Sequence, residues 1–145
     1  MSGISLGEYL SAMRHHKEEL IGRFEDFWRE ISNKARQSRV YQGHVIVKDA
    51  PEFTITLDGT GLTLLTRNRI VFLDKSPLLE IEFYKKNEKN DVSILKVYIS
   101  TEGALYLGHP SDVESLDFFH TEIGSDFFEA IIRSVTAGKL ISINR

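Results

Sequence analysis

The sequence contains no cysteine. This absence excludes disulfide cross-links, thiolate zinc sites, iron–sulfur clusters and a cysteine nucleophile. No stretch approaches the ~20 consecutive apolar residues of a membrane-spanning helix, and the first residues lack the basic start and apolar run of a signal peptide. We therefore expect a cytoplasmic protein that does not use a membrane.

Catalytic motifs are also missing. The sequence has no G-x-S-x-G elbow, no phosphate-binding loop, no dinucleotide fingerprint and no H-E-x-x-H helix. The five histidines (His15, His16, His44, His109 and His120) do not have the spacing of metal ligands. We predict no catalytic residue, no metal and no cofactor. The net charge of −3 also argues against a nucleic-acid partner.

Lysine and arginine are absent between Lys96 and Arg133, where seven acidic residues occur. The segment up to Lys48 is slightly basic instead, with eight basic and six acidic residues. Such polarity can steer association with a basic partner, and neighbouring aromatic residues suit a protein interface. The predicted partner-binding residues are Asp112, Glu114, Asp117, Phe118, His120 and Glu122.

One apolar stripe at helical spacing dominates the N-terminal part. It consists of Leu6, Leu10, Met13, Lys17, Leu20, Phe24, Phe27 and Ile31, with Lys17 as its only polar member. Steps of three and four residues predict a long amphipathic helix that must cover something. Ser5 and Glu8 have the spacing of a capping box, so the helix is expected from Leu6 to about Arg36.

This helix is longer than the domain it belongs to. About 30 helical residues span roughly 45 Å, whereas a compact chain of this size is about 38 Å across. Either Gly22 breaks the helix or the overhang packs on a second copy, and the unbroken stripe favours a homodimer. The predicted dimer face is Met13, Leu20, Phe24, Phe27, Trp28 and Ile31.

After Arg39 the apolar period changes to that of strands. Short turns separate the apolar runs, which predicts antiparallel pairing of neighbours in a meander. Two of the runs are expected to pair around a turn at Arg67–Asn68, and Asp58–Gly61 predicts another hairpin turn. The seven predicted strands are 40–48, 52–58, 62–66, 69–74, 79–84, 92–100 and 104–107.

The last part begins with an irregular segment, His109 to Gly124, followed by a helix that starts near Ser125. Gly138 is a candidate C-terminal cap of this helix, and Leu140–Ile143 is a candidate edge strand. The whole chain therefore reads as one α+β domain, 1–145. It divides into an N-terminal helix (1–38), an antiparallel sheet (39–108) and an acidic loop with the C-terminal helix (109–145).

Two arrangements of these elements compete. In one, the first helix lies across a curved open sheet. In the other, residues 39–137 close into a small barrel plugged by the last helix, which is similar in strand count to a pleckstrin-homology-like fold. In both, helical apolar faces must cover one face of the sheet.

Three functions remain open on the sequence. The first is a non-enzymatic interaction module, such as a small acidic adaptor, a secretion-chaperone-like protein or an immunity-type protein. The second is a small-molecule-binding or enzymatic domain with an apolar pocket between curved sheet and helix. That pocket would be lined by Phe53, Phe72, Phe83 and Tyr98, with His44, His109 or His120 as its polar group. The third is a subunit of a larger assembly.

Overall fold

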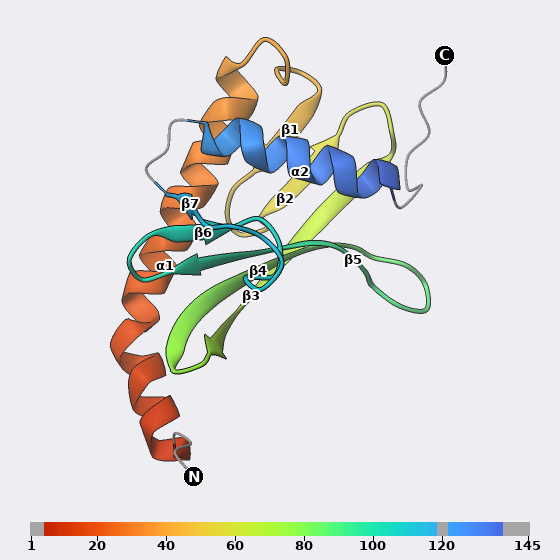
Figure 1. Cartoon of the computed structure of the whole chain (residues 1–145). Coiled ribbons are helices and arrows are strands. Elements are labelled where there is room, and N and C mark those ends of the chain that lie inside the picture. Colours follow the sequence, from red (N-terminus) through yellow and green to blue (C-terminus); the bar gives the residue numbers. More distant parts are fainter. Residues whose placement is uncertain (1–4, 119–121, 138–145) are drawn as a thin grey trace.

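The computed structural model describes residues 5–118 and 122–137. Two helices flank seven strands, which confirms the predicted α+β fold (Figure 1). In chain order the elements are α1 (Leu6–Gln37), β1 (Val45–Lys48), β2 (Thr54–Leu57), β3 (Leu62–Leu73), β4 (Ser76–Lys85), β5 (Val92–Ser100), β6 (Ala104–Tyr106), β7 (Leu116–Asp117) and α2 (Ile123–Ala137). Gly138 and Leu140–Ile143 lie outside the described residues.

Helix α1 begins where the capping residues place it. The backbone N–H of Glu8 donates to Ser5 Oγ at 3.2 Å, and the Ser5 hydroxyl donates in turn to the Glu8 carboxylate at 3.3 Å. At the other end, the N–H of Ser38 donates to the Lys34 carbonyl at 3.0 Å. The helix runs through Gly22 without a break, so the first of the two alternatives is wrong, whereas packing on a second copy stays a prediction.

The strands form an antiparallel meander in the order β1-β2-β3-β4-β5-β6-β7. Within the described part of the chain, β1 and β7 do not pair with each other, so the sheet is curled but open. This is the first of the two predicted arrangements. The turn Asp58–Gly61 joins β2 to β3 as expected, with Gly59 and Gly61 at φ 82° and 73°, values that glycine adopts without steric cost.

Two strand boundaries were predicted wrongly. Arg67 and Asn68 do not form a turn, because they continue the ladder of one long strand, β3, opposite Glu82 and Ile81 of β4. The seventh strand is instead β7, a short strand inside the segment that was predicted to be an acidic loop. The last helix also begins two residues earlier than expected, at Ile123.

Both helices cover the same face of the sheet. Phe83 of β4 stacks on Trp28 of α1, with ring centroids 6.3 Å apart, and contacts Phe127 of α2 at 4.9 Å. Phe27 and Phe127 join the two helices at 5.2 Å. These aromatic side chains are buried and form the centre of the core.

The predicted dimer face needs correction for this reason. Leu20, Phe24, Phe27, Trp28 and Ile31 are all buried within the chain, with exposed fractions of 6 % or less. They pack on their own sheet and on α2, so they present no surface to a second copy. The structure does not describe the side chain of Met13, the sixth residue of the predicted face.

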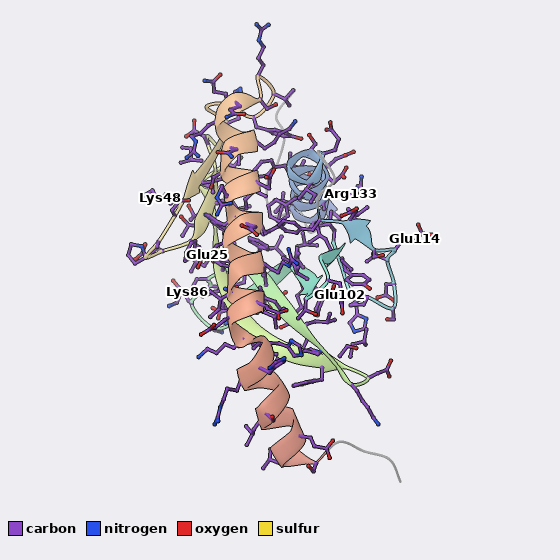
Figure 2. The ribbon with its side chains drawn as sticks, turned by 90° about the vertical axis from the view of Figure 1, so that its left-hand side faces the viewer. Glu25, Lys48, Lys86, Glu102, Glu114 and Arg133 are labelled. Carbon is purple, nitrogen blue, oxygen red and sulfur yellow. The ribbon has the colours of Figure 1, made fainter. Side chains whose placement is uncertain are left out.

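The overhang itself is present. The N-terminal turns of α1 extend past the sheet (Figures 1 and 2), and Leu6 and Leu10 are 74 % and 54 % exposed. Lys17, the polar member of the apolar stripe, stands between these exposed leucines and the buried Leu20. In the part of the chain described, neither helix combines the length and the apolar character needed to cross a lipid bilayer.

Candidate functional site: a groove along α1

A second row of side chains runs along α1 beside the buried stripe. Its members recur every three or four residues and therefore share one side of the helix. They are Ile21, Glu25, Trp28, Ser32 and Arg36, and the row begins at Lys17, the polar member of the stripe. Ile21 is 45 % exposed although it is apolar, and it borders the first of three hollows between the helix and the sheet.

The three hollows follow one another along the helix. The first, of about 360 Å³, lies between α1 and the apolar side chains Phe53, Ile70 and Leu79. The second, of about 250 Å³, lies between Trp28 and the segment Asp49–Ala50 that leads to β2. The third, of about 470 Å³, lies between the last turns of α1 and strand β1.

Neighbouring hollows share lining residues and therefore adjoin one another, and we call this row of three hollows the α1 groove. The first and second share Glu25 and Phe53, and the second and third share Ser32 and Arg36. From Lys17 to Arg36 the helix advances roughly 28 Å at about 1.5 Å per residue. An extended polypeptide of about eight residues, at ~3.3 Å each, covers this length.

The middle of the α1 groove is aromatic. Phe53 contacts both Phe24 and Trp28 edge to face, at 4.9 and 5.2 Å between ring centroids. Trp28 Nε1 is buried and has no hydrogen-bond acceptor among the described residues. Phe24 and Trp28 are 6 % and 3 % exposed, so the half-buried Phe53 is the aromatic side chain of this cluster that a bound segment would contact.

Polar residues line both ends of the α1 groove: Lys17, Asn68 and Arg69 line the first hollow, and others lie toward the C-terminal end of α1. The Ser32 hydroxyl donates to Asp49 Oδ1 at 3.2 Å and so ties α1 to the turn after β1. Arg36 Nη2 donates to Asn33 Oδ1 at 3.0 Å, a neutral acceptor. Among residues 5–118 and 122–137, Arg36 is the only charged residue that lines the third hollow. The exposed apolar side chain Ile21 lies at the first hollow, and the cationic side chain of Arg36 lies at the third.

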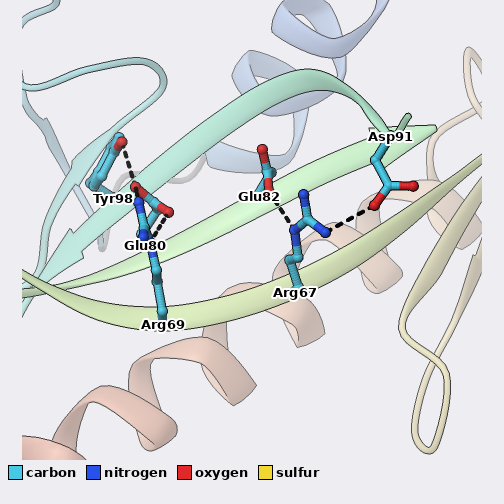
Figure 3. Close-up of polar contacts among 6 residues, drawn as sticks. All are labelled: Arg67, Arg69, Glu80, Glu82, Asp91 and Tyr98. Carbon is cyan, nitrogen blue, oxygen red and sulfur yellow. Dashed lines mark hydrogen bonds and ion pairs between the residues drawn. The ribbon is translucent and has the colours of Figure 1, made fainter. Parts of the chain in front are cut away.

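The opposite face of the sheet carries a network of charges (Figure 3). Arg69 of β3 donates to Glu80 of β4 at 2.6 Å, and the Tyr98 hydroxyl of β5 donates to the same carboxylate at 2.8 Å. Arg67 bridges Glu82 and Asp91. Its guanidinium also lies 4.2 Å from the centre of the Tyr84 ring. Alternation along the strands separates this network from the core face.

The network favours the ionised form of the Glu80 and Glu82 carboxylates. Burial alone would raise the pKa of Glu80, but the hydrogen bonds from Arg69 and Tyr98 outweigh burial and leave that pKa below its ordinary value. The same balance, with Arg67 as the main donor, lowers the pKa of Glu82. Each charge is paired across strands, so the arrangement stabilises the pairing of β3, β4 and β5.

Tyr98 gives this network a measurable pH dependence. Burial and the bond to Glu80 raise the pKa of Tyr98 from 10.0 to about 12. Its contribution to stability is then complete below pH 10 and is lost as the pH rises from 10 to about 12, because only the unfolded chain releases the proton in that interval. Ultraviolet absorbance titration of wild type minus Tyr98→Phe should isolate one phenol that ionises near pH 12. A difference curve centred on pH 10 would contradict this assignment.

The predicted partner-binding residues do not all lie on the surface of the protein. Asp112, Glu114 and Glu122 are exposed, as is Asp117 on β7. Phe118 belongs to the core instead: it is 5 % exposed, and its N–H donates to the Gly103 carbonyl at 2.8 Å. Phe118 must therefore be removed from the predicted surface, and His120 lies outside the described residues.

The residues predicted to line an apolar pocket do not come together in one hollow. Of the four predicted lining residues, only Phe53 lines the first hollow. Phe83 is fully buried in the core, and Tyr98 is buried on the other face of the sheet. The polar group is not one of the described histidines, because His44 and His109 do not line that hollow. Among the described residues, no three His, Asp or Glu side chains cluster as metal ligands.

The α1 groove was missed by sequence reasoning, although a signal for it exists. The row Lys17, Ile21, Glu25 mixes charge and apolar character along one edge of the buried stripe, which is typical of a boundary between core and solvent.

Comparison with protein-family models, with curated proteins and with solved structures found no match. The functional argument therefore rests on geometry.

Proposed function

We propose that this protein is a cytoplasmic, non-enzymatic interaction module of the adaptor, chaperone or immunity type, which binds a segment of another protein in the α1 groove. The observation that carries the proposal is the row of three adjoining hollows along α1 from Lys17 to Arg36. A small ligand needs one closed pocket, whereas three open hollows in a row fit an extended chain.

The charge distribution supports a second contact. Glu102 and Glu114 lie on one side of α1, and Lys48 lies on the other side (Figure 2). The exposed acids Asp112, Glu114, Asp117 and Glu122 would attract a basic surface of the same partner or of another one. The homodimer also remains a prediction. We place its contact surface at the N-terminal turns of α1, where Leu6 and Leu10 are exposed, and not at the buried stripe residues from Leu20 to Ile31.

A matched pair of variants tests the proposal. Ile21→Glu places a charge in the first hollow, and Ile132→Glu makes the same change at a 39 % exposed residue of α2 that lines none of the three hollows. Both wild-type positions are substantially exposed, so both variants should fold. Ile21→Glu should weaken partner binding about tenfold or more, because a carboxylate in an apolar contact loses its hydration.

The readout is quantitative co-purification from the native host at low salt. A protein that is retained by wild type and by Ile132→Glu, but lost with Ile21→Glu, supports the proposal. Equal retention by both variants, or no retained protein at all, contradicts it.

A small-molecule function is the second candidate, and the first hollow favours it. Its volume of about 360 Å³ lies within the ~300–1,000 Å³ range of ligand pockets, and its walls are mainly apolar. This candidate requires an apolar ligand to raise the melting temperature of wild type and not that of Ile21→Glu. A partner protein that competes with such a ligand would place both in the same groove.

A further inference from the structure

Strand β1 is the edge strand that borders the α1 groove. Among the described strands it pairs on one side only, with β2. The Asp58 N–H donates to the His44 carbonyl at 2.9 Å. This bond shows which residues of β1 direct their backbone groups toward β2 and which direct them away from it. Because hydrogen-bonding residues alternate along an antiparallel pair, Ile46 and Lys48 bond to β2, and the backbone groups of Val45 and Val47 point outward.

One of these outward groups is already used. The N–H of Val45 donates to the Tyr41 carbonyl at 2.9 Å. The carbonyl of Val45 and both backbone groups of Val47 are left to face the outer edge. These three groups alternate donor and acceptor in the way that an added strand requires.

The third hollow lies against this edge. Ser32, Ala35 and Arg36 of α1 form its helical side, and Val45–Val47 form its strand side. Ser32 and Ala35 are small side chains and are buried, with exposed fractions of 2 % and 3 %. An exposed strand edge beside a helix is a recurring site for binding extended peptides, in which backbone bonds give affinity and side-chain pockets give selectivity.

Proteins commonly protect their edge strands with charge, proline or short length. β1 has four residues and ends at Lys48, so it carries part of that protection. The edge nevertheless includes Ile46, which is 42 % exposed. An apolar side chain at this position favours pairing over protection.

We propose that the segment bound in the α1 groove adds to β1 as an extra strand and places a carboxylate opposite Arg36. This inference rests on the proposed function and specifies its partner: an extended segment with alternating apolar residues and an acidic residue at its β1 end. The charge follows from the third hollow, where Arg36 is the only charged lining residue in the part of the chain that the structure describes and donates to Asn33, a neutral acceptor. A lysine at the same place would meet a like charge.

The probe is a synthetic octapeptide of alternating valine and glutamate, compared with its valine–lysine counterpart. Main-chain bonds are common to all sequences, so binding on the order of millimolar is expected for an unselected peptide. In nuclear magnetic resonance titrations the acidic peptide should shift the Val47 amide and slow its hydrogen exchange. The lysine peptide should bind about tenfold more weakly or not at all.

Two variants make the test specific. Val47→Pro removes the outward donor and leaves the bonds to β2 in place, and Val47→Thr keeps that donor as the matched control. The proline variant should bind the acidic peptide about tenfold more weakly than the threonine variant. Arg36→Glu does not touch the ladder and should reverse the preference toward the lysine peptide, which keeps the test decisive even where Val47→Pro fails to fold.

Several results would overturn the inference. Equal binding by the proline and threonine variants would show that the backbone edge is not used. An unchanged Val47 amide at millimolar acidic peptide would do the same. Protection of Val47 in the free protein that increases with protein concentration would assign the edge to a second copy instead. Loss of the native partner with Ile21→Glu but not with Val47→Pro would retain the α1 groove and reject the strand pairing.

Discussion

Replacement of Phe83 by alanine is expected to remove about 3–5 kcal/mol from the free energy of unfolding, a large part of the ~5–15 kcal/mol of a typical domain. Phe83 is completely buried, and its ring contacts Trp28 of α1 and Phe127 of α2. The substitution leaves a cavity where both helices meet the sheet. Chemical denaturation monitored by circular dichroism measures the loss.

The matched control is Ile132→Ala on α2. Ile132 is 39 % exposed, so its truncation should cost less than about 1 kcal/mol. A loss below about 1 kcal/mol for Phe83→Ala, or losses of equal size for both variants, would show that the helices do not pack on β4 as described.

Replacement of Gly124 by alanine is expected to destabilise the fold by roughly 1–3 kcal/mol. A Cβ at this position would lie 2.5 Å from Lys34 Cβ and 2.7 Å from Lys34 Cγ, so α2 would have to move away from α1. The intrinsic helix preference of alanine offsets at most about 1 kcal/mol of this cost. Thermal and chemical denaturation measure the net change.

Gly22→Ala is the matched control, because it is the same substitution inside α1. A Cβ at Gly22 meets nothing within 4 Å, so only the helix preference remains, and stability should rise by about 0.5–1 kcal/mol. The two alanine variants should therefore change stability in opposite directions. A stabilising Gly124→Ala would contradict the close approach of the two helices.

Local signals were sufficient to predict most of the fold. The period of the stripe and the Ser5–Glu8 pair determine where α1 begins, and both act within a few residues. Turn residues and alternation likewise predicted the meander. The error at Arg67–Asn68 arose because two polar residues in a row resemble a turn. They remain in β3 because Arg67 finds Glu82 and Asp91 across the sheet, partners that a local pattern does not reveal.

The error in the dimer face has a different cause. A buried stripe shows that side chains need cover, and the same pattern results whether that cover is the chain's own sheet or a second copy. Phe27 meets Phe127, a residue 100 positions away in the chain, so its partner is not visible in the local sequence. For the same reason the α1 groove, built from α1, β1, the turn before β2, β3 and β4, could be identified only from the tertiary structure.

Site-specific photo-crosslinking is the most direct test of the central proposal, that the α1 groove holds a segment of a partner protein. A photoreactive residue is placed in turn at Ile21 in the groove, at Ile132 on α2 and at Glu114 in the acidic loop, and the adducts from the native host are mapped by mass spectrometry. The proposal predicts that Ile21 links to one continuous segment of a single partner and that Ile132 does not link to it. Adducts to that partner from Ile132 or Glu114, with none from Ile21, would contradict it.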